Sequence, residues 1–221
     1  MSNVAVVNAA AGLRLAARKE PAMATIPSEA ALAPAVKAVQ SAKGSRAAYQ
    51  RTERRRGWQT EVSSDLADFL WTLDTFYFGT AMAEGQPYIQ YRGGPTGFLK
   101  PIGPPTLAFA DFGGNRQHLS VGNLPENHKA ILFLIDCEDR RRVKASSRAR
   151  VVEGDDRRKA EPAASSYPGG VECAIVFETQ AWNDNCHQYI QRRIPQAKVQ
   201  SEIDRLNCQI DGLKVQLVSR S

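Results

Sequence analysis

Apolar residues recur at two different periods along this chain, and the change of period predicts where helices give way to strands. In residues 63–74 the leucines and Phe69 repeat at the spacing of one helical face, behind two serines that can cap a helix. Upstream, residues 34–55 predict two short helices that are separated at Gly44. The folded part of the chain is therefore expected to begin with helices.

Short apolar and β-branched runs fill the middle of the chain. They cover residues 76–82, 87–92, 106–112, 129–136, 140–154 and 171–182. The first two are joined by a short connection containing Gly85, as in a β-hairpin, whereas residues 129–136 are apolar throughout, which predicts a strand covered on both faces. Because helices do not alternate with these six strands, the pattern favours a small antiparallel barrel over a doubly wound parallel sheet.

The two ends of the chain have patterns of their own. Residues 1–31 are rich in Ala and poor in bulky apolar residues, which predicts a flexible tail. Near the C-terminus six apolar residues have the spacing of an a/d heptad seam: Val199, Ile203, Leu206, Ile210, Leu213 and Leu217. A helix of this kind either lies on its own barrel or forms a short coiled coil with a second subunit, and the sequence leaves both open. The expected organisation is a tail at 1–31, one domain at 32–194 and an amphipathic helix at 195–221.

Composition excludes several classes of protein. The 221 residues, 43% of them hydrophobic, are enough to bury the core of one domain with appendages. No run approaches the roughly 18 apolar residues of a membrane span, so no membrane association is expected. The four cysteines form neither a CxxC pair nor a zinc-type cluster, and no secretory segment is evident. Free thiols in a cytoplasmic protein are therefore expected.

The net charge of +6 and the sequence pI of about 9.3 are compatible with phosphorylated ligands or nucleic acid as partners. The basic residues are spread along the chain, apart from arginine triplets at 54–56 and 140–142. These triplets lack interleaved aromatic residues, and no nucleic-acid-binding motif is present. Nucleic acid is therefore not the expected partner.

Residues 109–123, FADFGGNRQHLSVGN, contain the clearest candidate site. A strand-like run reaches Asp111, two glycines follow, and Asn115, Arg116 and Gln117 precede a segment that can form a helix. Asn115 is suited to cap that helix, whose free N–H groups attract anions, and Arg116 offers a planar cationic fork for phosphate. These residues alone leave two interpretations open: a phosphate site, or a capped surface helix with an exposed arginine.

Other catalytic patterns are not recognisable. A nucleoside-triphosphate loop requires a lysine directly after its last glycine. In GGPTGFLK, residues 93–100, Lys100 stands three residues after Gly97, so the requirement is not met. The three histidines have no nucleophile partner at a convincing local spacing, and no carboxylate cluster suggests a metal. An enzymatic function would therefore rely on a cofactor for its chemistry.

Three segments resemble, in order and spacing, the pyridoxamine 5′-phosphate oxidase-like family of FMN-binding split barrels. They are FYFGTAMAEGQPYIQYRGGPTGFLK (76–100), TLAFADFGGNRQHLSVGNL (106–124) and ILFLIDCEDRRRVKASSRARVVEG (131–154), within a matching span of about 45–194. The flanking segments are similar to a bacterial, oxidase-like branch of unassigned substrate. The resemblance implies a mainly β protein with a six-stranded antiparallel split barrel, N-terminal helices, and a homodimer that holds FMN in two clefts at the subunit interface.

The same resemblance assigns cofactor contacts by position. The strand containing Gln90, Tyr91 and Arg92 would run beside the flavin, and Arg116 would hold the FMN phosphate. The oxidases have Ser-Arg-Lys where this chain has Asn115, Arg116 and Gln117, so Arg92 and Lys100 are candidates to replace the missing lysine charge. The remaining implied contacts are Asp111 at the end of its strand, Arg142 and Lys144 from the partner subunit, and Trp182 near the ring system.

The implied function is FMN-dependent oxidoreduction, in which hydride or electrons pass to or from an unknown small molecule, with NADH or NADPH as the candidate donor. True B6 oxidases have an Arg-x-His pair after the late Trp, and this chain has none after Trp182. Pyridoxamine phosphate is therefore not the expected substrate, and no catalytic residue is assigned. A non-catalytic flavin- or haem-binding carrier or sensor on the same fold is the alternative.

Overall fold

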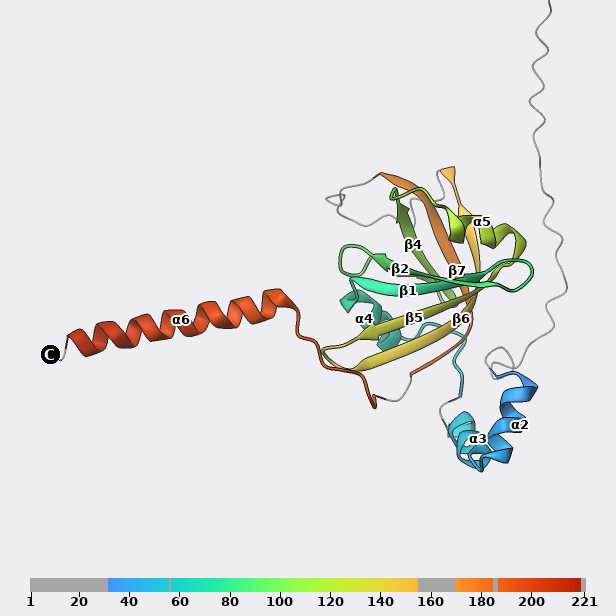
Figure 1. Ribbon diagram of the computed structural model, residues 1–221, viewed down its shortest axis with the longest axis horizontal. Coiled ribbons are helices and arrows are strands. Elements are labelled where there is room, and N and C mark those ends of the chain that lie inside the picture. The colour runs from blue at the N-terminus through green and yellow to red at the C-terminus, as the bar shows by residue number, and fades with distance from the viewer. Residues whose placement is uncertain (1–31, 56, 155–169, 185–186, 220–221) are drawn as a thin grey trace, which may run out of the picture.

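The computed structural model describes residues 32–55, 57–154, 170–184 and 187–219, so the expected tail at 1–31 lies outside the described residues. The described chain forms one seven-stranded antiparallel sheet with helices before, between and after its strands (Figure 1). The strands are β1 Thr75–Ala81, β2 Pro87–Gly93, β3 Lys100–Gly103, β4 Thr106–Phe112, β5 Lys129–Asp136, β6 Arg141–Val152 and β7 Val171–Asp184. The helices are α2 Pro34–Ala42, α3 Arg46–Arg55, α4 Ser64–Thr72, α5 Leu119–Glu126 and α6 Gln196–Val218.

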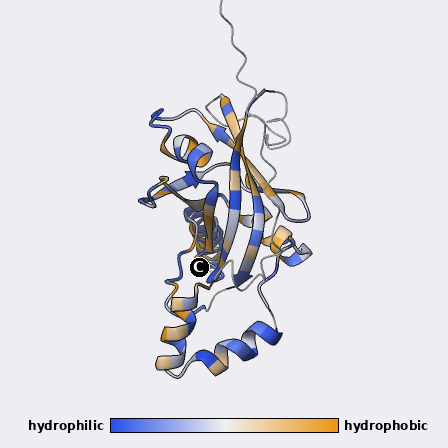
Figure 2. Cartoon of the chain, turned by 90° about the vertical axis from the view of Figure 1, so that its right-hand side faces the viewer, coloured by the Kyte–Doolittle hydropathy of each residue, from blue (hydrophilic) through white to orange (hydrophobic). Residues whose placement is uncertain are grey.

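The strands follow the order β2-β1-β5-β6-β7-β4-β3 in the sheet. The six expected strands are all present, but the expected count of six is wrong because β3 adds a seventh in a segment that resembles a Gly/Pro-rich loop. Pro101 and Gly103 are unusual in a strand, and they are tolerated here because β3 lies at the edge of the sheet. Hydrophilic and hydrophobic residues follow one another along the strands (Figure 2), as expected where one face of a sheet covers the core.

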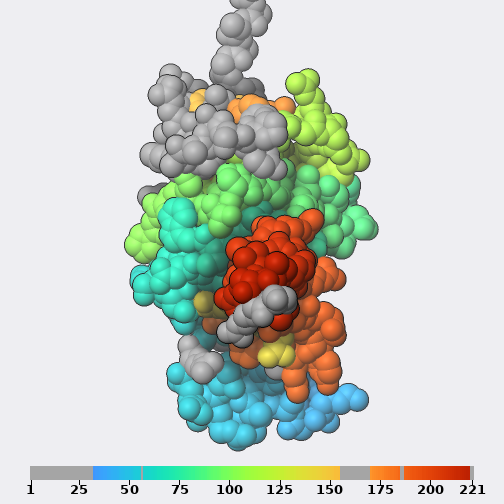
Figure 3. Space-filling view, turned by 90° about the vertical axis from the view of Figure 1, so that its left-hand side faces the viewer, coloured from blue at the N-terminus to red at the C-terminus, as the bar shows by residue number. Residues whose placement is uncertain are grey.

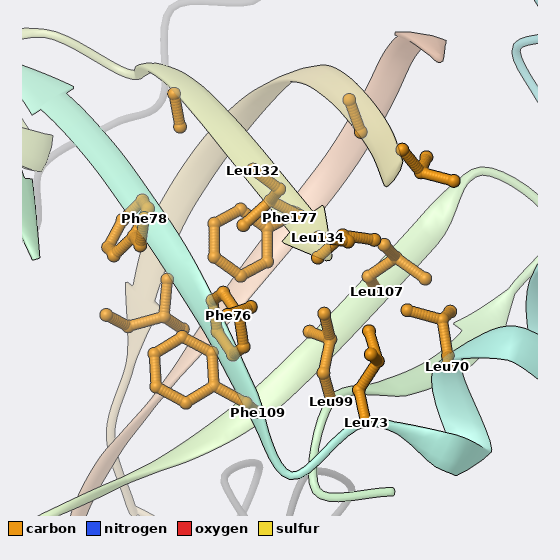
Figure 4. Packing of buried hydrophobic residues seen from close by; sticks show 14 of the residues in the cluster. Leu70, Leu73, Phe76, Phe78, Leu99, Leu107, Phe109, Leu132, Leu134 and Phe177 are labelled. Carbon is orange, nitrogen blue, oxygen red and sulfur yellow. The ribbon is translucent and has the colours of Figure 1, made fainter. Parts of the chain in front are cut away.

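The sheet curls around a single aromatic core. The rings of Phe76 on β1 and Phe109 on β4 have centroids 5.2 Å apart, although three strands lie between β1 and β4 in the sheet. In a flat sheet these strands would be about 19 Å apart at the usual spacing of about 4.8 Å. The ring centroids of Phe78 on β1 and Phe177 on β7 are likewise only 5.1 Å apart. The side chains of Phe78 and Phe177 point towards one another in Figure 4. Among the described residues no ladder joins β2 to β3, so the hydrogen-bonded sheet is open.

Helix α4 closes one end of this core. Ser63 caps the helix by accepting a hydrogen bond from the Leu66 N–H at 3.2 Å. Leu66, Phe69 and Leu70 are buried, as their spacing predicts. The capped amphipathic helix expected at residues 63–74 is therefore confirmed.

Strand β5 is buried on one face only. Ala130, Leu132 and Leu134 point into the core, whereas the Ile131 side chain between them is 41% exposed. The expected cover on both faces of residues 129–136 is therefore wrong for the described chain, which buries one face. The apolar residues on the outer face of β5 lack a covering element among the described residues.

Helix α6 leaves the sheet and projects away from it (Figure 1), and Figure 3 views the molecule along this direction. None of its described residues is buried. Its first turn is tied to the β5–β6 turn by an ion pair between Lys198 Nζ and Glu138 Oε2 at 2.6 Å. Of the two alternatives for this helix, the one in which it lies on its own barrel is therefore wrong. None of the described helices combines the length and the apolar content needed to cross a membrane.

Candidate functional site

A pocket of about 310 Å³ lies where β2, β4, the β4–α5 loop and the start of α5 meet. We call it the arginine pocket. Six of the residues that the sequence indicates line it: Gln90, Arg92, Asp111, Asn115, Arg116 and Gln117. The fold therefore brings the candidates of strand β2 together with those of the Gly-rich loop, although the two segments are about 20 residues apart in the chain.

Arg92 and Asp111 form a bidentate ion pair at the inner side of the arginine pocket. Arg92 Nη1 donates to Asp111 Oδ1, and Arg92 Nη2 donates to Asp111 Oδ2 at 3.2 Å. Their side chains are only 15% and 10% exposed, and burial raises the pKa of the Asp111 carboxyl despite the opposing effect of Arg92. Arg92 Nε is also buried and has no hydrogen-bond partner among the described residues. In the described parts of the chain this N–H donor is thus enclosed and unsatisfied.

Arg116 lies at the outer side of the pocket. Its side chain is 78% exposed, and its Nε is 3.6 Å from Glu172 Oε1 on β7. An ion pair this exposed and this long contributes little, so Arg116 can exchange Glu172 for another anion. Glu172 is a lining residue that the sequence did not indicate, because only the pairing of β4 with β7 brings it to this place.

Helix α5 begins later than the sequence suggests. Asn115 Oδ1 accepts a hydrogen bond from the Gln117 N–H at 3.2 Å in a local turn, while the helix starts at Leu119. Arg116 and His118 have positive φ values of 58° and 52°, which interrupt helical geometry between Asn115 and the helix. The expectation that Asn115 caps the helix is therefore wrong. The Ser120 hydroxyl donates to Gln90 Oε1 at 2.9 Å and so links α5 to β2.

The other sequence candidates lie outside the arginine pocket. Tyr91 points to the opposite face of β2 from its neighbours Gln90 and Arg92, because successive strand residues alternate. Lys100 begins β3. Trp182 is 2% exposed within the core and donates from Nε1 to the Glu61 carbonyl at 2.8 Å. Its expected place near a ring system stays a prediction.

An outer apolar face covers β2, β1 and β5 on the side away from the core. We define it by Tyr77, Ile89, Tyr91, Ile131 and Phe133. The ring of Tyr77 lies between those of Tyr91 and Phe133, with centroid distances of 5.7 and 6.2 Å. These aromatic rings form a continuous strip across three strands.

Arg142 and Lys144 lie at two further hollows. The Arg142 guanidinium lies 5.8 Å from the centroid of the Phe133 ring and lines a largely apolar hollow of about 520 Å³ beside the outer apolar face. Lys144 lines a separate hollow of about 380 Å³ between α3 and the sheet, together with Trp58 and Asn183. One chain therefore does not bring Arg142 and Lys144 to the arginine pocket.

In the described parts of the chain, no group of three or more His, Cys, Asp or Glu side chains has an arrangement that would hold a metal ion. The titratable carboxylates of the arginine pocket, Asp111 and Glu172, each have an arginine as partner. The pocket thus balances two guanidinium groups against two carboxylates. His118 also lines the pocket, and the exposed Arg116–Glu172 pair is the one that an incoming anion could replace.

No protein-family model matches the sequence, and no curated protein matches it. Several solved structures are similar at the level of the fold. HupZ of Group A Streptococcus is 16% identical, with a TM-score of 0.46 over 60% of this chain and 98% of HupZ. A pyridoxinephosphate oxidase family protein of Clostridium acetobutylicum, related to general stress protein 26 of B. subtilis, is 16% identical, with a TM-score of 0.41 over 54% of this chain and 84% of its own.

An FMN-binding protein of Syntrophomonas wolfei is 15% identical, with a TM-score of 0.39 over 67% of this chain and 97% of its own. These structural neighbours include a pyridoxinephosphate oxidase family protein and an FMN-binding protein.

Proposed function

We propose that this protein binds FMN, with the phosphate in the arginine pocket, and acts as an FMN-dependent oxidoreductase on a small molecule. The observation that carries the proposal is the exchangeable guanidinium of Arg116, which lines the same pocket as the bidentate Arg92–Asp111 pair. The phosphate of FMN carries about two negative charges near neutral pH, by analogy with other phosphate monoesters. Arginine is the side chain best suited to such a group, because its planar fork donates two parallel hydrogen bonds.

The Gly-rich loop fits the same ligand. A Cβ atom at Gly113 would lie 3.1 Å from Glu172 Oε1, whereas at Gly114 it would meet open space. Gly113 thus passes close to the flexible end of the Glu172 side chain, and Gly114 lines the pocket with open space beside it. Binding of a phosphate would replace Glu172 as the partner of Arg116, and the long, exposed Arg116–Glu172 pair costs little to break.

We further propose that the protein is a homodimer, and the outer apolar face supports this proposal. Its aromatic strip and the outer side of β5 are surfaces that the described residues of one chain leave in water. A second copy on this face would complete the split-barrel dimer and bring Arg142 and Lys144 of one chain towards the FMN of the other. When bound, FMN would supply hydride or electron transfer, while the residues of this chain bind and orient it.

The test is a titration of the purified protein with FMN and with riboflavin, which lacks the phosphate. Flavin fluorescence or absorbance reports binding. Arg116→Ala should weaken FMN binding by about tenfold or more, since a charge-assisted bond contributes at least about 1.5 kcal/mol, and should leave riboflavin binding unchanged. The control Arg148→Ala removes the same charge from an exposed position on β6 outside the pocket and should change neither. A protein that fails to bind FMN, or an Arg116→Ala variant with unchanged FMN affinity, would overturn the proposal.

A non-catalytic carrier or sensor is the second candidate, and the pairing of both pocket carboxylates with arginines favours it. Reduction of the bound flavin by NADH or NADPH, followed by reoxidation by an acceptor, separates the two functions. Turnover supports the oxidoreductase. A tightly bound flavin that neither donor reduces supports the carrier.

A further inference from the structure

We propose that α6 forms a parallel, two-stranded coiled coil with α6 of a second copy of this chain. The proposal concerns the heptad seam, the six residues Val199, Ile203, Leu206, Ile210, Leu213 and Leu217. In the described chain these side chains are 42% to 67% exposed, and the helix projects away from the sheet (Figure 1). The inference is independent of the proposed flavin site, because α6 contributes nothing to the arginine pocket.

A solvated helix of this composition needs a partner. Gly212 lies in its interior, and glycine disfavours helix there. Two ion pairs within the helix, Glu202 with Arg205 and Lys214 with Asp211, are exposed pairs of the kind that contribute little. Helices in proteins are stabilised chiefly by packing of their apolar face, and this one has no packing surface in its own chain among the described residues.

The choice of residues along the seam indicates a second copy as the partner. The register places Ile203, Ile210 and Leu217 at position a, and Val199, Leu206 and Leu213 at position d. Isoleucine at a with leucine at d, as in the central heptads, is the combination that favours parallel dimers over larger bundles. In a parallel dimer with a two-fold axis along the coil, each a residue faces the same a residue of the second copy, and each d residue faces the same d residue. The heptad seam is thus complementary to itself.

The flanking positions are compatible with the same arrangement. In a parallel dimer each g residue faces the e residue of the next heptad in the partner, which pairs Glu202 with Asn207 and Gln209 with Lys214. Neither pair brings like charges together. Gln200 and Gln216, at the ends of the seam, are uncharged. The flanks therefore place no electrostatic barrier against self-association.

Disulfide cross-linking in the full-length chain tests the proposal. Cys137, Cys186 and Cys208 are first replaced by Ser, and buried Cys173 is retained. Leu213→Cys then places one thiol in the seam, while Val215→Cys places a thiol on the outer side of the same helical turn as a matched control. Under a mild oxidant, Leu213→Cys should form covalent dimers at least about tenfold faster than Val215→Cys. Equal rates, or no dimer from either variant, would overturn the proposal.

Orientation and the role of the seam need two further arms. In a mixture of the Ile203→Cys and Leu213→Cys proteins, a parallel coil should cross-link each variant to itself. Preferential cross-linking of one variant to the other would show an antiparallel coil and overturn the parallel assignment. Adding Ile203→Asp and Ile210→Asp to the Leu213→Cys protein should abolish its cross-linking. These two side chains are exposed, so the sheet should keep its fold, which near-ultraviolet circular dichroism verifies. Cross-linking that survives both aspartates would show that the seam is not the contact.

Discussion

At the scale of single residues, the two pocket arginines have different relations to the fold. Arg92 is buried with Asp111, while Arg116 is exposed and held only by a long contact to Glu172. Removing Arg92 leaves a buried carboxylate without its partner, a change that typically costs about 3 kcal/mol or more, whereas removing an exposed arginine costs within about 0.5 kcal/mol. Both residues line the arginine pocket, but only Arg92 is expected to contribute to stability.

Urea unfolding of Arg92→Ala and Arg116→Ala therefore gives a direct comparison. We expect the first variant to lose about 3 kcal/mol of unfolding free energy and the second to unfold like the parent. The double variant Arg92→Ala/Asp111→Ala should recover part of the loss, because it leaves no uncompensated charge. Equal stabilities of the two single variants would contradict the buried role of Arg92.

Cys173 offers a pH-dependent test of the same environment. Burial, with the nearby Asp111 carboxylate as the next cause, raises the pKa of the thiol from 9.0 to about 11. The folded state therefore holds the thiol proton more tightly than the unfolded chain does. The contribution of the protonated Cys173 thiol to the free energy of unfolding is fully present below pH 9 and is lost as the pH rises through about 11.

At pH 8 we expect iodoacetamide to modify Cys173 at least about 100-fold more slowly than exposed Cys208, because the thiolate is the reactive form. Mass spectrometry of the alkylated peptides measures both rates in one sample. Similar rates for the two cysteines would show that Cys173 is accessible and ionised.

Local sequence context indicated Arg116 correctly as a pocket residue but could not reveal its partner. The residues around it carry a Gly-rich loop and a helix-forming segment, both of which are local signals. Glu172 follows in the chain by more than 50 residues and reaches the pocket only through the antiparallel register in which Asp111 pairs with Cys173. Non-local register of this kind leaves no local pattern, and the same is true of the link from Ser120 to Gln90.

At the scale of elements, strong periodicity was a reliable guide and mixed signals were not. Helix α4 and strands β1, β2, β4, β5, β6 and β7 were recognised because each has one clear apolar face or run. Strand β3 was missed because Pro101 and Gly103 are typical of loops, and only its edge position makes them acceptable. The start of α5 was placed too early because the positive φ values of Arg116 and His118 are set by the loop as a whole.

The cap of α4 is an element whose contribution to stability can be measured. Ser63 accepts from the Leu66 N–H, so Ser63→Ala should lower the free energy of unfolding by about 1 kcal/mol. Ser64→Ala is the matched control, since Ser64 is exposed at the first helical position and is not the cap. Equal urea midpoints for the two variants would contradict the capping role of Ser63.

At the scale of the whole molecule, the described residues leave the outer apolar face of the sheet and the heptad seam of α6 uncovered. Residues 129–136 led us to expect cover on both faces of β5, and the chain itself supplies cover on one. The proposed second copy on the outer apolar face would cover the other. Because the seam and the sheet face are separate surfaces, the sheet contact has to be tested with the seam disrupted.

The sheet contact can be tested in a protein whose seam carries Ile203→Asp and Ile210→Asp. We expect this protein to remain a dimer at micromolar concentration, and Ile131→Lys on the outer apolar face to dissociate it, because a lysine charge would be buried at the interface. Ala47→Lys adds the same charge at an exposed position of α3 and should leave the dimer intact. Sedimentation equilibrium measures the association. FMN affinity should fall together with dimerisation, since the proposed site takes residues from both copies. A monomeric Ile131→Lys protein that binds FMN as tightly as the parent would show that the flavin site does not depend on the interface.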